Sequence, residues 1–503
     1  MGMWRDPALR RILLLALLLR LSYVLQASST PLFEVLLLDS EFYDRQAKAL
    51  VAGQGWGEGV FFMNPLYPYF LALIYWACEA RWWVVGAIQA ALGAINCGLI
   101  YALGLAAWGR REGLVGAGLA AVYGVFIFYD GALLTATPIL FFNLAALGSL
   151  LRWKEGGGRA WLWGAGICLG LSALARPLVL LFVGLLGGWF WTQRRLRAWG
   201  LVCLGCGVVL GPAVARNWLV GGEFVLTTSS AGMNFYVGNN PLATGIYAQA
   251  EFVPSAEPDQ EREGFLREAQ RRAGQPLTPA QASRFWLAEG LGFIRAEPGA
   301  YLGLLWRKFY LFWNDVESQN NLSYYLARDW VPLLRFCALD WGLVAPLALA
   351  AWGVLFRDRR EALLEWYATA YLLGCLLFFV SSEYRLPAVP LLLLYAGRGL
   401  LWAREQWRLR AWRKLGALAL ATLLLGGGIN HSDDLVRRLK SRRVDYYNFG
   451  MLYERRGEYR RAEELVRQAL AIDPQFGPGL QALARLQQRR ALEKLLGPQG
   501  GGP

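Results

Sequence analysis

Apolar residues fill long blocks of this sequence, and short basic or polar stretches separate the blocks. Blocks of this kind are typical of membrane-spanning helices, since about 20 apolar residues cross a bilayer. The blocks predicted to span are Ile12–Gln26, Trp83–Trp108, Leu114–Phe128, Leu133–Leu151, Ala160–Ala175, Pro177–Trp191, Trp199–Ala215, Val331–Phe356, Ala362–Val380, Leu386–Trp402 and Leu415–Gly428. The pattern therefore predicts an all-α polytopic membrane protein with about eleven transmembrane helices. The first block lacks a small-residue cleavage site, so we expect a retained span and not a removed signal peptide.

Two further apolar segments are predicted to lie along the outer membrane surface. Leu66–Ala77 has only about a dozen residues, fewer than a span requires. Tyr301–Trp313 is apolar on much of its surface but carries Arg307 and Lys308. This mixture is typical of an amphipathic helix that lies in the membrane interface.

Basic loops set the predicted orientation. When the first span runs outward, three basic loops lie inside, as the positive-inside rule requires. These loops are GRREG, RWKEGGGR and QRRLR. If Leu66–Ala77 crossed the membrane, all three loops would lie outside. The scheme makes residues 1–430 a membrane domain of the cytoplasmic (inner) membrane, with outer loops at 27–82 and 220–330.

The C-terminal tail has a repeat-like pattern. The stretch YYNFGMLYERRGEYRRAEELVRQALAIDP has the aromatic, glycine and alanine spacing of a tetratricopeptide repeat. We expect a helical repeat tail at 431–497 and a disordered end at 498–503. One repeat is too short for a stable solenoid, so the tail must pack on the membrane domain, on a second copy or on a protein partner. The crossing count places the tail outside. Charge alone does not decide the direction of the last span, because RRLKSRR after it is as basic as the loop before it.

Composition narrows the function classes. Of the 503 residues 56% are hydrophobic and 17% are charged, which excludes an ordinary soluble domain. The net charge of +14 gathers in loops between spans, so no nucleic-acid partner is predicted. The seven cysteines are scattered and there is one histidine, which argues against a zinc site or a disulfide framework.

The predicted topology gathers acids and bases on the outer face, beginning with LDSEFYD after the first span. These charged residues are Asp39, Glu41, Asp44, Asp130, Arg176, Arg216, Lys308, Glu317, Glu383 and Arg385. Arginine binds phosphate bidentately, and a neighbouring carboxylate can take a proton from an acceptor hydroxyl. Together these groups suit glycosyl transfer from a polyprenyl-phosphate sugar, with the lipid phosphate as leaving group.

Several motifs carry a family resemblance. DSEFYDRQAKAL with NPLYPYF, then GLSALARP, ARNW, FYVGNNPLATGIY and SSEYRLPAVP follow one another through residues 8–430. In this order they resemble the polytopic glycosyltransferases of the GT-C fold, near the protein O-mannosyltransferases and the aminoarabinose transferases that modify lipid A. The resemblance implies a dolichyl- or undecaprenyl-phosphate sugar donor and an acceptor that is a protein, lipid or glycan on the extracytoplasmic face.

The resemblance also implies residue roles. It makes Asp39 the catalytic base, with Glu41 as competitor because Ser40 separates two acids that are adjacent in many relatives. The residues expected to bind substrate are Tyr43, Asp44, Asp130, Arg176, Arg216, Asn239, Asn240, Lys308, Glu317, Glu383, Tyr384 and Arg385. Relatives often have an acid where Ala136 stands, with Asp130 as the substitute here, so no cofactor is assigned and a divalent metal stays open.

Each candidate also has a structural interpretation. Glu41 and Asp44 suit a helix N-terminus, where the dipole favours acids, and Asp39 suits a solvated loop. Arg176 and Lys308 can anchor at lipid head groups, Glu383 and Arg385 can pair with each other, and Asn239, Asn240, Asn320 and Asn321 can form turns instead of binding sugar hydroxyls. Arg20, inside the first span, is expected to be buried against a polar group such as an outer-loop acid.

Three rival functions remain open. A flippase or transporter of lipid-linked sugars would place polar groups near the bilayer midplane on broken, repeated helices, whereas here the charges crowd one face. An oligosaccharide ligase or polymerase with a diphosphate-linked donor would also need outer arginines. The third alternative is a non-catalytic scaffold with a repeat tail.

Overall fold

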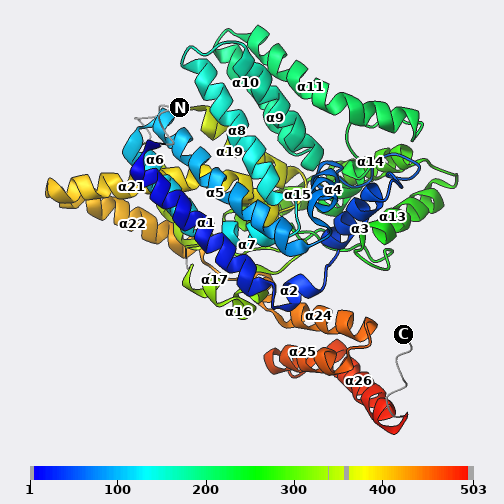
Figure 1. Cartoon of the computed structure of the whole chain (residues 1–503). Coiled ribbons are helices and arrows are strands. Elements are labelled where there is room, and N and C mark those ends of the chain that lie inside the picture. The colour runs from blue at the N-terminus through cyan, green and yellow to red at the C-terminus, as the bar shows by residue number, and fades with distance from the viewer. Residues whose placement is uncertain (1–4, 338, 356–361, 497–503) are drawn as a thin grey trace.

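The computed structural model describes residues 5–337, 339–355 and 362–496. Within those ranges every regular element is a helix, and two isolated bridges join Tyr123 to Leu339 and Ile246 to Val380. The predicted disordered end at 498–503 lies outside the described residues. Figure 1 shows a large helical body with a small helical tail beneath it.

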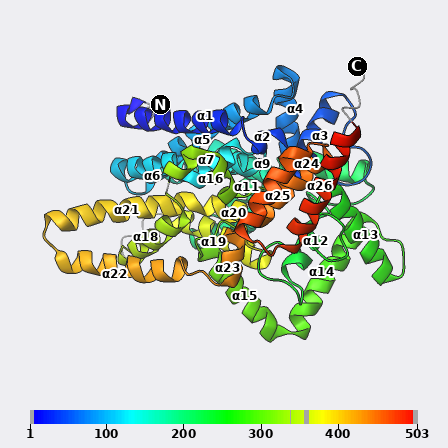
Figure 2. The same cartoon turned by 90° about the horizontal axis from the view of Figure 1, so that it is seen from below.

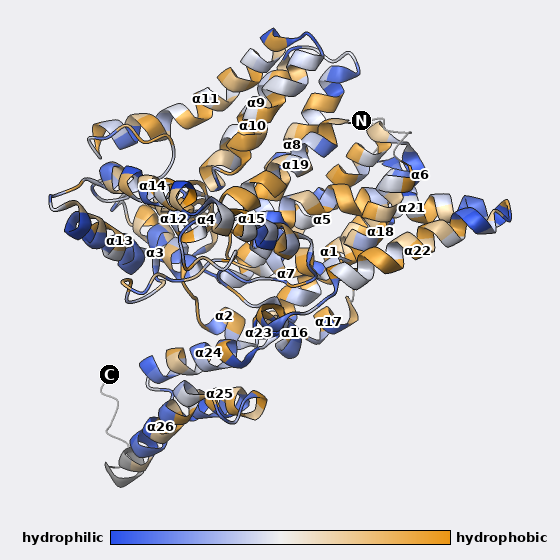
Figure 3. Cartoon of the chain, turned by 180° about the vertical axis from the view of Figure 1, so that it is seen from behind, coloured by the Kyte–Doolittle hydropathy of each residue, from blue (hydrophilic) through white to orange (hydrophobic). Residues whose placement is uncertain are grey.

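A helix occupies every block that the sequence predicts to span. The first set is α1 (Pro7–Ala27), α5 (Trp82–Ala107), α6 (Arg110–Val122), α7 (Gly124–Gly131), α8 (Ala136–Lys154), α9 (Ala160–Ala175), α10 (Val179–Thr192) and α11 (Leu196–Leu219). The second set is α17 (Pro332–Phe336), α18 (Trp341–Val354), α19 (Ala362–Leu377), the 3-10 turn η3 (Leu386–Ala388), α21 (Val389–Arg408) and α22 (Trp412–Ile429). Figure 3 shows apolar residues dominating α8 to α11, α19 and α22.

The chain is a multi-pass membrane protein. Four stretches of helix are long and apolar enough to cross, namely Trp82–Ala107, Ala136–Lys154, Leu196–Leu219 and Ser382–Arg408, and the number rises to six if each of two bent helix pairs is one span. Five shorter apolar helices accompany them in the described ranges, among them α4 (Leu66–Cys78). The count of about eleven crossings stays a prediction, because length alone does not decide whether short helices cross.

Two predicted spans are broken, which corrects the expectation of continuous helices over Leu114–Phe128 and Val331–Phe356. Tyr123 separates α6 from α7 with extended backbone, and α17 ends at Phe336 whereas α18 begins only at Trp341. The two breaks lie against each other: the Gly124 N–H donates to the Leu339 carbonyl at 3.1 Å. Extended backbone inside an apolar body needs such partners, so the breaks form as a pair.

The outer polar loop is largely helical, and the sequence analysis foresaw only the helix over Tyr301–Trp313. It contains α12 (Ala231–Gly238), α13 (Pro258–Ala273), α14 (Pro279–Ala296) and α15 (Pro298–Trp313). A capping box at Thr278 and Gln281 starts α14, and prolines occupy the first turns of α13, α14 and α15. Trp286 packs against Phe252 and Phe265 to form a small separate core. We refer to residues 231–296 as the outer subdomain.

Short helices connect the membrane body to the outer subdomain. They are α2 (Pro31–Glu34), α3 (Asp39–Val51), α4, α16 (Tyr324–Trp330) and α20 (Ser382–Arg385). Helices α3 and α4 pack on each other beside α13, as Figures 1 and 2 show. The segment Leu66–Ala77 is thus helical as expected, and Tyr301–Trp313 falls within α15.

The tail is a helical extension that docks on the loops at one end of the body. It comprises α23 (Asp434–Lys440), α24 (Arg443–Arg455), α25 (Tyr459–Ile472) and α26 (Gly477–Leu496). Helices α24 and α25 pack closely, because Gly450 leaves room for Val466. Tyr453 of α24 donates to Glu34 of α2 at 2.6 Å, so the tail lies on the face of the body that carries α2 and α3.

Candidate active site

A cavity lies where α3, the α9–α10 junction, α20 and the 317–323 loop meet under the outer subdomain. From the membrane body and its loops it is lined by Leu38, Asp39, Tyr43, Phe62, Met63, Asn64, Arg176, Asn320, Asn321, Phe379 and Tyr384. From the outer subdomain it is lined by Met233, Asn234, Tyr247, Ala256 and Glu261, and Ser230 lines it from the position just before α12. Asp39, Tyr43, Arg176 and Tyr384, which the sequence proposed for the site, therefore share one cavity. We call it the Asp39 cavity.

Asp39 begins α3 and is held by a reciprocal pair of hydrogen bonds. Its backbone N–H donates to Asn321 Oδ1 at 3.2 Å, and Asn321 Nδ2 donates to Asp39 Oδ2 at 3.0 Å. The preceding residue, Leu38, has a φ of 48°, a strained backbone conformation for a branched side chain. Asp39 Oδ1 has no hydrogen-bond partner in the part of the chain that the structure describes, so this oxygen is left for a ligand.

The surroundings of Asp39 favour a carboxylate that can take up a proton near neutral pH. Burial and, to a smaller extent, the negative charge of Glu383 raise the pKa of Asp39 to about 6. The Asn321 hydrogen bond and the positive charge of Arg176 oppose this rise. A base with a pKa close to the working pH is the most effective kind, because it is both deprotonated and a good proton acceptor.

Glu41 differs from Asp39 in its exposure and in its position relative to the cavity. It lies in the first turn of α3 with its side chain exposed, and it does not line the Asp39 cavity. The sequence left open which of these two acids is the base. In the structure Asp39 lines the same cavity as Arg176, whereas Glu41 lies on the surface.

Arg176 occupies the break between α9 and α10, where its backbone is extended because Pro177 follows. Its Nη2 donates to Thr135 Oγ1 at 3.1 Å and pairs with the Glu383 carboxylate, while Nη1 donates to the Glu383 carbonyl at 3.2 Å. The guanidinium lies over the Tyr384 ring at 4.5 Å. A guanidinium has five N–H groups, so Arg176 keeps donors, Nε–H among them, for a ligand in the cavity.

Glu261 and Tyr247 are site residues that the sequence analysis missed. Tyr247 donates its hydroxyl to Glu261 Oε1 at 2.7 Å, and both line the cavity. Burial, with a smaller contribution from the charge of Asp39, raises the pKa of Glu261 to about 7, and the Tyr247 hydrogen bond opposes this rise. Glu261 lies in a strongly charged helix, where nothing in the sequence separates it from its neighbours Glu257 and Glu263.

Other candidates lie elsewhere and hold the fold together. Asp44 accepts from Tyr75 Oη at 2.7 Å and Trp82 Nε1 at 3.0 Å, linking α3 to α4 and α5. Asp130 pairs with Arg20 at 2.6 Å inside the body, which confirms that Arg20 is buried against an acid.

The remaining basic and amide candidates bind backbone groups. Arg216 donates to the carbonyls of Gly57 and Gly59 and lies over Phe61. Lys308 is buried, and its Nζ donates to Asn239 Oδ1 at 2.9 Å and to the Leu376 carbonyl at 3.0 Å. Asn240 donates to the carbonyls of Tyr236 and Val237 and accepts from the Leu242 N–H, which is the expected turn geometry. Lys308 is thus not a lipid anchor, since its head group is enclosed.

The alternative that Glu383 pairs with Arg385 is wrong. Glu383 pairs with Arg176, whereas Arg385 pairs with Glu317 at 3.0 Å. Arg385 also donates to the carbonyls of Phe312, Asn314 and Val316, so it fixes the chain that leaves α15. Side chains two positions apart on a helical turn point in different directions, which is why Glu383 and Arg385 find different partners.

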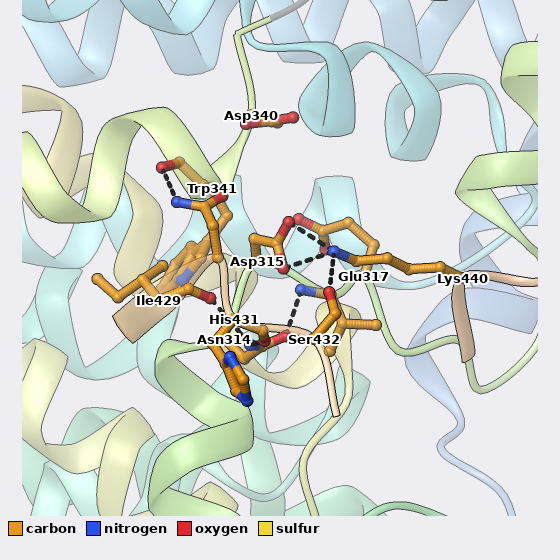
Figure 4. A network of polar contacts seen from close by, with 12 residues as sticks. Asn314, Asp315, Glu317, Asp340, Trp341, Ile429, His431, Ser432 and Lys440 are labelled. Atoms are coloured by element: carbon orange, nitrogen blue, oxygen red, sulfur yellow. Dashed lines mark hydrogen bonds and ion pairs between the residues drawn. The ribbon is translucent and has the colours of Figure 1, made fainter. Parts of the chain in front are cut away.

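Figure 4 shows the polar network next to Glu317. Lys440 of α23 donates to both oxygens of Asp315, at 2.7 and 2.8 Å, and Asn314 Nδ2 donates to the carbonyls of Ile429 and His431. This network fastens the start of the tail to the segment that follows α15.

A metal site is not formed by the side chains that the structure describes. No group of three or more His, Cys, Asp or Glu residues in those ranges is arranged to hold an ion. In the Asp39 cavity the oxygen ligands are two separate carboxylates, Asp39 and Glu261, with asparagine amides and tyrosines between them. These donors do not fit the clustered oxygen set that a divalent cation requires.

The structure matches solved structures of membrane glycosyltransferases at low sequence identity. The Archaeoglobus fulgidus oligosaccharyltransferase in its apo form has a TM-score of 0.47 and 14% identity over 89% of this chain and 58% of its own. ArnT from Cupriavidus metallidurans bound to undecaprenyl phosphate has a TM-score of 0.39 and 14% identity over 78% of each chain. The S. cerevisiae protein O-mannosyltransferase complex bound to the sugar donor scores 0.33 with 17% identity over 49% of this chain and 39% of its own.

These likenesses are too distant to say what the chain does. The chain spans a little over half the length of the archaeal enzyme. No protein-family model and no curated protein matches the sequence.

Proposed function

We propose that the chain is a membrane glycosyltransferase that moves a monosaccharide from a polyprenyl-phosphate donor to an acceptor hydroxyl in the Asp39 cavity. The proposal rests on two groups that line one cavity. The Asp39 carboxylate has an oxygen without a hydrogen-bond partner among the described residues, and the Arg176 guanidinium has N–H donors to spare. This combination suits a reaction that removes a proton from one oxygen and releases an anion at another.

The proposed reaction is a single displacement. Asp39 Oδ1 takes the proton of the acceptor hydroxyl, and the acceptor oxygen attacks the anomeric carbon of the donor sugar. The bond between that carbon and the phosphate oxygen breaks, and polyprenyl phosphate leaves with the electron pair. Arg176 stabilises the charge that develops on the phosphate, while Asn321 fixes Asp39 through its second oxygen. A single displacement of this kind inverts the configuration at the anomeric carbon.

Glu383 has a supporting role in this scheme. Its carboxylate binds Nη2 of Arg176 and its carbonyl binds Nη1, while the guanidinium lies over the Tyr384 ring. A donor phosphate approaching the free N–H groups therefore meets a guanidinium that is already oriented, which lowers the ordering cost of binding.

We further propose that the isoprenoid chain occupies an apolar cavity of about 540 Å³ between α15, α18, α19 and α21. Its lining includes Phe312, Trp313, Trp352 and Trp366, and apolar lining of this kind suits a hydrocarbon chain. Phe312 lies between this cavity and the buried Arg385–Glu317 pair, since its carbonyl accepts from Arg385. The site is proposed to face the extracytoplasmic side of the cytoplasmic membrane, in line with the basic loops.

The test is sugar transfer in membranes from labelled polyprenyl-phosphate sugars, with Asp39→Asn beside a matched control. Glu41→Gln makes the same chemical change two residues away on the exposed surface of α3. We expect Asp39→Asn to reduce transfer by about 100-fold or more, because general-base catalysis contributes about 10²–10⁴. Glu41→Gln should keep wild-type transfer. Equal losses in both variants, or unchanged transfer in Asp39→Asn, would refute the assignment of the base.

A further inference from the structure

Helix α24 of the tail touches three segments, and each segment also lines the Asp39 cavity. The first contact is to the 317–323 loop. Gln319 Nε2 donates to Asp445 Oδ1 at 2.6 Å. Two residues further on, Asn321 makes the reciprocal hydrogen bonds with Asp39. The tail therefore contacts the 317–323 loop, and the same loop binds the Asp39 carboxylate through Asn321.

The second contact is to the segment that leads into α3. Glu34 accepts from Tyr453 Oη at 2.6 Å and from Arg461 Nη1 at 2.7 Å, and the Glu34 carbonyl accepts from Arg456 at 3.0 Å. Glu34 lies five residues before Asp39, and the strained Leu38 lies between them. A strained residue persists only when its surroundings hold it in place.

The third contact is to the outer subdomain. Arg455 of α24 donates to Glu257 at 3.3 Å, and Glu257 occupies the N-cap position of α13, one turn before Glu261. This pair is exposed and contributes less than the other two contacts. Each of the three contacts nevertheless joins α24 to a segment that lines the cavity.

Aromatic packing fixes α24 in this place. Phe449 packs edge-to-face on Trp330 of α16 at 5.0 Å, and Tyr446 donates to Asp329 at 3.0 Å. Tyr446, Phe449 and Tyr453 are buried and share one face of the helix, at the spacing i, i+3 and i+7. The apolar face that marks the repeat-like pattern in the sequence is therefore also the face that docks on the body.

We propose that α24 is a positioning element of the active site, and that Asp445 and Glu34 are positioning residues that set the Asp39–Asn321 pair. The role assigned to Asp39 rests on the proposed function, whereas the positioning itself does not. With Asp445 in place, Gln319 holds the loop and Asn321 stays opposite Asp39. Without it, the loop loosens and Asp39 loses hydrogen bonds that favour its charged form.

The pH dependence of transfer reports this loss directly. The charged and titratable groups facing Asp39 are Glu383, Arg176, Tyr43, Tyr384 and the Tyr247–Glu261 pair. None of them touches Asp445 among the described contacts, so a change at Asp445 reaches Asp39 through the loop. Weakening the Asn321 bond moves the proton uptake of Asp39 to higher pH, and the base is then protonated over a wider acidic range.

The test compares Asp445→Ala with Asp445→Asn in the full-length protein. Asparagine keeps an oxygen acceptor for Gln319, and alanine does not. We expect Asp445→Ala to lower transfer about tenfold at pH 5.5 and less than about twofold at pH 8.5, and Asp445→Asn to restore the wild-type profile. Arg460→Ala is the control, because Arg460 pairs with Glu464 within the tail, away from the body. A uniform loss at all pH values would indicate a structural role only and would overturn the proposal.

A second readout needs no activity. Hydrogen–deuterium exchange of the peptides covering 31–39 and 317–323 should speed up in Asp445→Ala, because the Asp39 N–H donates to Asn321. Faster exchange in a protein whose wild type shows no transfer would support positioning and refute the glycosyltransferase. Unchanged exchange in these peptides would overturn the positioning proposal whatever the activity.

Discussion

Replacing Asp39 with asparagine should reduce transfer by about 100-fold or more and at the same time stabilise the fold above about pH 6. The reason is that the wild-type carboxylate is charged in a place that disfavours charge. Burial and the nearby Glu383 raise the pKa of Asp39 from its ordinary value of 3.8 to about 6. Asparagine has nearly the same shape, keeps an oxygen for the Asn321 hydrogen bond and carries no charge.

The size of the effect follows from the two pKa values. A change from 3.8 to about 6 corresponds to about 3 kcal/mol, at about 1.4 kcal/mol for each tenfold change in proton affinity. Because the pKa of Asp39 is raised in the folded state, its contribution to stability is complete below about pH 4. That contribution is lost as the pH rises through about 6. The asparagine variant should therefore match wild type at pH 4 and exceed it by up to about 3 kcal/mol at pH 8.

Thermal unfolding in detergent at pH 4, 6 and 8 measures this difference. The expected result is a rise in Tm for Asp39→Asn that grows with pH, with no such trend in Glu41→Gln, whose side chain is exposed. A gain of the same size at every pH, or a loss of stability at pH 8, would refute the electrostatic account of the site. Stability gained together with activity lost is the pattern of a functional residue that the fold alone does not favour.

Three further changes test other parts of the structure. Asp130→Ala should destabilise by about 3–5 kcal/mol because it leaves the buried Arg20 charge unpaired, and the double replacement Asp130→Ala with Arg20→Leu should recover part of that loss in denaturation experiments. Gly93→Ala should cost about 1–3 kcal/mol because the added methyl would overlap this ion pair, whereas Gly148→Ala, with open space around it, should be neutral or stabilising. Arg176→Lys should lower transfer about 10- to 100-fold in kinetic assays while leaving Tm nearly unchanged, because lysine keeps the charge but not the planar fork.

Local patterning was enough to predict most helices but not where they break. The Arg176 break was predictable because Pro177 disfavours helix at the preceding residue. The Tyr123 break has no local signal, since VYGVF reads as continuous apolar helix. It depends on the chain near Leu339, more than 200 residues away, which supplies the backbone partner. The helices of the outer subdomain were missed because their polar surfaces resemble a loop when charge alone is counted.

The site residues were likewise predictable only where the sequence pattern and the topology identify them. Topology predicted Asp39, Arg176 and Glu383 on one face, and in the structure Asp39 and Arg176 line one cavity while Glu383 pairs with Arg176. Sequence could not separate Asp39 from Glu41, because their difference lies in which face of α3 each occupies. Nor could it reveal Glu261, since a helix from the outer subdomain has to fold over the membrane body before that carboxylate reaches Asp39.

The most direct test of glycosyl transfer is to follow the lipid itself. Purified protein in vesicles would receive a polyprenyl-phosphate sugar and an acceptor, and mass spectrometry would count both lipid products and modified acceptor. The proposed function predicts one molecule of free polyprenyl phosphate for each acceptor that gains a sugar, with neither formed by Asp39→Asn. Donor that crosses the bilayer unchanged, or turnover restricted to diphosphate-linked donors, would contradict it.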